Sequence, residues 1–139
     1  MNPRTVPLTK KDNTPMPDRT TAVPTATTAE LTAEDAKLVT LARSARARVG
    51  AAEGAAVRDQ DGRTYAAATV ALPSLSITAL QLAVASAAAA GAKLIEAAAV
   101  VTEAAALEGA GHAAVRDLNP SAPIHVAGPD ATLLGTVTA

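Results

Sequence analysis

Few side chains in this sequence can act as catalytic bases or metal ligands. The chain has two histidines, His112 and His125, and no cysteine. Disulfides, thiolate zinc sites and cysteine nucleophiles are therefore excluded. Glu108 lies four residues before His112, a spacing that places both side chains on one face of a helix. Two ligands make a weak metal site, so we expect neither a metal nor another cofactor.

Nucleophile and phosphate-binding motifs are also missing. The serines at positions 74, 76 and 86 lack the G-x-S-x-G surroundings of a hydrolase nucleophile. The segment Gly109-Ala110-Gly111 is too short for a phosphate-binding loop and lacks its lysine. One catalytic alternative remains, a hydrolase in which His112 works with a carboxylate such as Glu103 or Glu108. It requires these groups to converge in one cleft.

The composition predicts a thin core. Hydrophobic residues make up 49% of the chain, but many are alanines, and Tyr65 is the only aromatic residue. Burying one methyl group stabilises a fold by only about 0.8 kcal/mol. A domain of this size also buries a limited share of its surface. We therefore expect a homo-oligomer, a dimer or a tetramer, with another protein as the alternative partner.

Charge gives little support for binding to nucleic acid or membranes. The formal net charge is −1, so no overall field attracts a polyanion. A local basic patch of Arg43, Arg46 and Arg48 is the exception. Its simpler interpretation is a solvated helix face with cations near the C-terminal end of the helix dipole. An RNA-associated accessory role for this patch is kept as an alternative.

The N-terminal region differs from the rest of the chain. Residues 1–28 are rich in proline and threonine without a hydrophobic period, so we expect a disordered tail before a domain over 29–139. This region has no apolar segment typical of a signal peptide. The longest apolar run is mostly alanine and contains Lys93 and Glu96, so we expect no membrane span. A soluble, cytoplasmic protein is the expectation.

The hydrophobic pattern predicts an α/β fold. Thr32 and Asp35 resemble a capping box at the start of a helix that Gly50 ends. An Asp-Gly turn at 61–62 between short apolar runs predicts a β-hairpin. Pro73 and Ser74 then lead into a central helix, apolar on nearly every side and therefore buried, which ends at Gly91.

The remaining residues alternate between strands and one short helix. We expect a strand over 94–101, a helix over 109–118, and strands over 123–127 and 132–137. The order α-β-β-α-β-α-β-β predicts a mixed sheet covered by helices.

This order, together with E-G-A-A-V-R-D-Q-D-G-R-T-Y at 53–65, resembles the small homotetrameric cytidine deaminase family over about residues 30–139. The resemblance implies a three-layer fold with a five-stranded mixed sheet covered by helices. It also implies a reaction in which a zinc-bound water attacks C4 of the pyrimidine while a glutamate carries protons. Three protein ligands hold such a zinc ion.

The family's functional motifs fall on unsuitable residues. The [HC]-A-E motif matches T-A-L at 78–80, and the P-C-x-x-C motif matches E-G-A-G-H at 108–112. The ribose-binding N-x-E matches T-V-A at 69–71. In this match, Leu80 takes the place of the proton-carrying glutamate. We call the six residues at these positions the vestigial pocket: Thr69, Ala71, Thr78, Leu80, Gly109 and His112.

These substitutions predict a catalytically inactive cytidine deaminase-like protein. Its role would be binding or assembly, with its own copies, another protein or a nucleoside-like ligand. The hydrolase with a relocated site and the RNA-associated protein remain the alternatives.

Overall fold

A computed structural model describes residues 31–104 and 106–139. The expected tail over 1–28 lies outside the described residues. The elements are α1 (Ala33–Val49), β2 (Glu53–Asp59), β3 (Thr64–Ala68), β4 (Val70–Leu72), β5 (Leu75–Ile77), α2 (Ala79–Ala89), β6 (Ile95–Thr102), α3 (Gly109–Leu118), β7 (Ile124–Ala127) and β8 (Leu133–Val137). No helix among them is long and apolar enough to cross a membrane.

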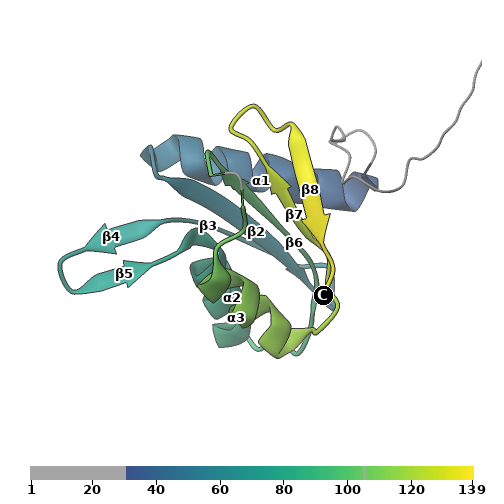
Figure 1. The fold of residues 1–139 in the computed structure, drawn as a ribbon. Coiled ribbons are helices and arrows are strands. Elements are labelled where there is room, and N and C mark those ends of the chain that lie inside the picture. The colour runs from purple at the N-terminus through teal and green to yellow at the C-terminus, as the bar shows by residue number, and fades with distance from the viewer. Residues whose placement is uncertain (1–30, 105) are drawn as a thin grey trace, which may run out of the picture.

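The main sheet has five strands in the order β3-β2-β6-β7-β8. Strands β6 and β7 are parallel, and the other neighbours are antiparallel. Helix α1 covers one face, while α2 and α3 cover the other (Figure 1). The predicted three-layer α/β fold with a mixed five-stranded sheet is therefore confirmed.

The predicted hairpin of β2 and β3 is built around Asp59. Its Oδ1 accepts hydrogen bonds from the N–H groups of Asp61 and Arg63, at 2.9 and 3.0 Å. The Tyr65 hydroxyl donates to Oδ2 at 2.9 Å. Burial opposes ionisation, but these hydrogen bonds outweigh it and hold the pKa of Asp59 below its ordinary value. Gly62 supplies the positive φ of 82° that the turn requires.

The central helix begins later than the sequence predicted. Residues 70–77 form a separate hairpin of β4 and β5, in which Leu72 opposes Leu75. Pro73 and Ser74 are therefore a turn and not the entry to a helix, in keeping with proline's fixed φ. Helix α2 starts only after Thr78.

Nor is α2 buried on every side. Ala79, Leu80, Ala83, Val84 and Ala87 are buried, whereas the alanines at 85, 88 and 89 are exposed. The sheet covers only one side of the helix, and a methyl group is small enough to remain in solvent. The sequence of an alanine-rich helix therefore suggests that every face is buried, although one face is exposed to solvent.

Small residues let the layers approach closely. A Cβ added at Gly54 in β2 would lie 2.0 Å from the carbonyl oxygen of Ala42 in α1. The backbones of α1 and β2 are therefore in contact, and only glycine fits at this position. Most residues of the core are alanines, and their small side chains allow the layers to pack this closely.

Candidate functional site

A cavity of about 330 Å³ opens beside the start of α2. Two residues of the vestigial pocket, Thr69 and Thr78, line it. The other lining residues are Arg46, Ala52, Glu53, Thr102, Glu103 and Ala104. The volume lies at the lower end of the range for small-molecule sites.

The polar groups of this cavity mostly bind one another. Glu53 accepts a hydrogen bond from the Thr102 hydroxyl at 2.7 Å, and the Glu53 N–H donates to Thr69 Oγ1 at 3.0 Å. Arg46 Nη2 lies 2.9 Å from Glu103 Oε2. The wall is therefore a preorganised polar surface with one cation and two carboxylates.

The position of Arg46 divides the predicted basic patch. Its side chain is only 22% exposed, donates to the Ala52 carbonyl and pairs with Glu103. Arg43 and Arg48 remain on the exposed surface of α1. The three arginines do not form one free cationic surface, which weakens the RNA-associated alternative.

Thr78, which the resemblance aligns with the family's first metal ligand, acts as a helix cap. Its Oγ1 accepts from the Gln81 N–H at 3.1 Å, and the Gln81 side chain accepts from the Thr78 N–H at 3.2 Å. This capping box stabilises the first turn of α2.

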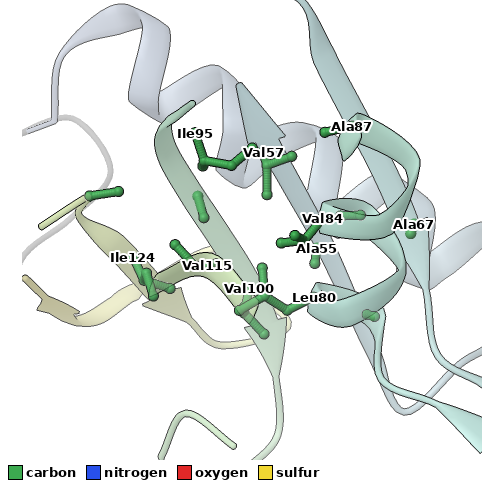
Figure 2. Packing of buried hydrophobic residues seen from close by; sticks show 14 of the residues in the cluster. Ala55, Val57, Ala67, Leu80, Val84, Ala87, Ile95, Val100, Val115 and Ile124 are labelled. Carbon is green, nitrogen blue, oxygen red and sulfur yellow. The ribbon is translucent and has the colours of Figure 1, made fainter. Parts of the chain in front are cut away.

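Leu80, which the resemblance aligns with the proton-carrying glutamate, is fully buried. It belongs to the apolar cluster between α2, α3 and the sheet, where it packs with Val84 and Val100 (Figure 2). The residue that the resemblance aligns with the proton carrier is thus part of the hydrophobic core.

The two motif regions nevertheless meet, as the resemblance implies. Glu108 caps α3 by accepting from the Gly111 N–H at 2.7 Å. A Cβ added at Gly111 would lie 2.0 Å from Glu108 Oε2 and 2.8 Å from Leu80 Cβ. The start of α3 therefore packs directly against the start of α2. Gly109 contributes no side chain there, and Ala71 lies in the exposed β4–β5 hairpin.

The residues present do not fit a zinc ion. Within the described ranges, no three histidine or carboxylate side chains gather as metal ligands. His112 Nε2 and Glu108 Oε2 are buried atoms without a hydrogen-bond partner among the described residues. Glu103 lies at the cavity and pairs with Arg46 instead. Of the two carboxylates that the hydrolase alternative could use, Glu103 is therefore engaged by Arg46.

Comparison with known proteins agrees with this architecture. A family model described as cytidine deaminase-like matches residues 31–131. The chain belongs to the cytidine deaminase-like family. No curated relative matches the sequence.

Two solved structures resemble this family member. The cytidine deaminase from Burkholderia pseudomallei is 25% identical, with a TM-score of 0.65 over 73% of this chain and 90% of that one. The cytidine deaminase from Mycobacterium leprae is 19% identical, with a TM-score of 0.56 over the same shares. The second likeness shows the fold alone.

Outside the family's site, the structure assembles a polar network that the sequence analysis missed. His125 in β7 is 4% exposed. Its Nε2 lies 2.9 Å from Asp35 Oδ2 in α1, and its Nδ1 lies 2.8 Å from Thr136 Oγ1 in β8. The only sequence signal was a histidine within an otherwise apolar strand, I-H-V-A at 124–127.

Two further charges extend this network across the α1 face of the sheet. Arg58 in β2 lies 2.9 Å from Asp35 Oδ1 and 3.0 Å from Glu96 Oε1. Burial of Asp35 disfavours its charge, but hydrogen bonds and charge attraction from His125 and Arg58 outweigh it. Together they hold the pKa of Asp35 below its ordinary value. Asp35 is therefore an ionised carboxylate shared by a histidine and an arginine.

Proposed function

We propose that this member of the cytidine deaminase-like family does not deaminate nucleosides and acts in binding or assembly. The observation that carries the proposal is the full burial of Leu80, the residue that the resemblance aligns with the family's proton carrier. A leucine cannot exchange a proton, and its neighbours in the apolar cluster cannot do so for it. An apolar side chain here also avoids the cost of burying a charged group.

The metal chemistry supports the same proposal. Hydrolytic deamination requires a zinc ion with three protein ligands and an open position for water. The hydroxyl of Thr78 is a poor zinc ligand and is engaged in capping α2. His112 is the single strong donor among the motif positions.

Metal analysis and an activity assay test this proposal. We expect the purified protein to contain far less than one zinc ion per chain and to release no ammonia from cytidine. The Burkholderia pseudomallei cytidine deaminase, assayed in the same buffer with added zinc, is the positive control. About one zinc ion per chain, or measurable conversion of cytidine, would contradict the proposal.

Assembly between copies is supported by the hairpin of β4 and β5, which projects from the body of the molecule (Figure 1). Leu72 and Leu75, which flank its turn, are 58% and 53% exposed. An isolated two-stranded hairpin is only marginally stable in water. A second copy that covers these leucines would stabilise the hairpin and enlarge the thin core.

Light scattering after size-exclusion chromatography measures this assembly. We expect the wild-type protein to elute as an oligomer and the double variant Leu72→Ser, Leu75→Ser to shift toward the monomer. Val49→Ser is the matched control, because Val49 is 63% exposed but lies at the end of α1. A monomeric wild-type protein at micromolar concentration would exclude this assembly.

A further inference from the structure

We propose that the cavity beside the start of α2 binds a small primary amine that carries hydroxyl groups, such as an amino sugar. The ammonium group of the ligand pairs with Glu53, and a ligand hydroxyl accepts a hydrogen bond from Thr78. Both residues line the cavity of about 330 Å³. This inference rests on the proposed binding role and names the class of ligand for it.

Four polar side chains of the cavity lie on the same face of the sheet. Glu53, Thr69 and Thr102 each lie two residues from a strand residue of the apolar cluster that packs against α2. Side chains alternate along a strand, so all three point toward the α2 side. Thr78 caps α2 on that side. One ligand can therefore reach all four groups from the same cavity.

The charge of the lining favours a cation. Arg46 and Glu103 pair at 2.9 Å, so their charges offset each other. Among residues 31–104 and 106–139, no salt bridge joins Glu53 to a cation. Glu53 is half-buried and has lost part of its hydration. A carboxylate in this position gains from a cationic partner.

Hydrogen bonds hold Glu53 in place before a ligand arrives. Its Oε2 accepts from the Thr102 hydroxyl at 2.7 Å. Its backbone N–H donates to Thr69 Oγ1 at 3.0 Å, and its carbonyl oxygen accepts from the same hydroxyl at 3.3 Å. These contacts leave Oε1 of the carboxylate for the ligand. A group that is already fixed loses little freedom on binding, which favours affinity.

Thr78 supplies a hydrogen-bond donor to the same cavity. Its Oγ1 accepts from the Gln81 N–H at 3.1 Å. A hydroxyl can accept and donate at once, so the Thr78 hydrogen is available to a ligand oxygen. A ligand with an ammonium and a hydroxyl satisfies both Glu53 and Thr78, whereas a simple alkylamine satisfies only Glu53.

Other small ligands match this lining less well. A neutral nucleoside has no cation for Glu53, so the carboxylate loses hydration without gaining a partner. A carboxylic acid needs Arg46, which is held by Glu103 and the Ala52 carbonyl. The cavity volume lies at the lower end of the range for small-molecule sites, which suits a molecule the size of a monosaccharide.

Calorimetric titration of the full-length protein with glucosamine and glucose tests the proposal. The two sugars share one ring, but glucose has a hydroxyl where glucosamine has its amine. The titration is done at mildly acidic pH, where the amine is charged. We expect glucosamine to bind at least about tenfold more tightly than glucose, because a hydrogen bond to a charged group is gained. Chemical-shift changes of the Thr69 and Thr78 amides locate the site.

A charge-removing variant tests the role of Glu53. Glu53→Gln keeps the shape of the side chain and can still accept from Thr102, so it should fold as wild type by circular dichroism. It should weaken glucosamine binding about tenfold and leave glucose binding unchanged. Glu34→Gln is the matched control, because it changes the net charge equally but lies exposed in the first turn of α1. It should bind glucosamine as wild type does.

Several results would overturn the proposal. They are equal affinities for the two sugars, no saturable binding of glucosamine, and glucosamine binding that Glu53→Gln leaves unchanged. The test is separate from that of the proposed function. A protein that binds glucosamine and also converts cytidine would refute the inactivity but keep this site. A zinc-free, inactive protein that does not bind glucosamine would refute this site alone.

Discussion

The two faces of the central sheet differ in chemistry. The face covered by α2 and α3, where the resemblance places the family's reaction, is filled by an apolar cluster that includes Leu80 and Val100. The face covered by α1 contains Asp35, Arg58 and His125 among small apolar residues. A network of paired, largely buried ionisable groups thus lies on the face opposite that cluster.

Under the proposed function, this difference explains how one backbone loses a reaction without losing its fold. The apolar face needs close packing only, and Leu80 meets that need better than a charged residue. The polar face instead depends on matched hydrogen bonds, because an unpaired buried charge is costly. Substitutions on the α2/α3 face should lower stability by changing the volume that side chains fill. Substitutions on the α1 face should lower it by leaving charges unpaired, and this effect should depend on pH.

The largest expected effect is that of Leu80→Ala. Removing a fully buried leucine side chain leaves a cavity and should lower the free energy of unfolding by about 2–5 kcal/mol. The leucine side chain does not ionise, so the loss of unfolding free energy should be similar at neutral and acidic pH. Urea denaturation followed by circular dichroism measures both values.

Leu94→Ala is the control for this substitution. Leu94 is 38% exposed just before β6, so the same change should cost only about 1 kcal/mol. Equal losses for the two variants would mean that the α2 face is not the apolar core described above.

Arg58→Met should have the next largest effect. It removes the cation that Asp35 and Glu96 share, and lost hydrogen bonds to charged groups cost about 1.5–3 kcal/mol. Arg63→Met is matched in chemistry, but Arg63 is 69% exposed and pairs with Asp61 at 3.5 Å. Its expected cost is below about 1 kcal/mol. Similar urea midpoints for the two variants would show that the buried network does not stabilise the fold.

Much of the fold could be predicted because local signals and tertiary structure agree. The Asp-Gly turn, the cap at Thr32 and the apolar strand before α3 each specify their element within a few residues. The β4–β5 hairpin was missed because V-A-L-P-S-L-S-I has no strong turn signal beyond proline, and the alanine-rich stretch after it suggests a longer helix.

The site was harder to predict, for a different reason. The positions of Thr78 and Leu80 follow from a motif within one segment. The network of His125 joins residues 90 and 11 positions away in the sequence, so no local spacing reveals it. Asp35 was interpreted as half of a capping box, but its side chain turns toward His125 and Arg58.

The polar face should also give the fold a pH dependence through Asp35. Its pKa in the folded state lies below the ordinary value of 3.8, so the unfolded chain binds more protons in this range. The stabilisation by Asp35 is therefore complete above the ordinary pKa and is lost as the pH falls through the lowered value. The stability difference between wild type and Asp35→Asn should shrink over this interval.

Unfolding of both proteins in urea at several pH values checks this expectation. Asp59 and Asp130 also have lowered pKa values, but wild type and Asp35→Asn both contain them, so their effect cancels in the stability difference. A stability difference that stays constant down to strongly acidic pH would contradict the role of Asp35 as the ionised centre of the network.

The smallest expected effect concerns Thr78, where the apolar face retains a polar side chain. If Thr78 serves as the cap of α2 and not as a metal ligand, Thr78→Ala should lower the free energy of unfolding by about 1 kcal/mol, with or without added zinc. Thr78→Ser keeps the capping oxygen and should restore most of the loss. Thr32→Ala provides the same measurement on α1, since Thr32 Oγ1 accepts from the Asp35 N–H at 3.1 Å. A zinc-dependent stabilisation of wild type that Thr78→Ala abolishes would instead assign a metal to this face.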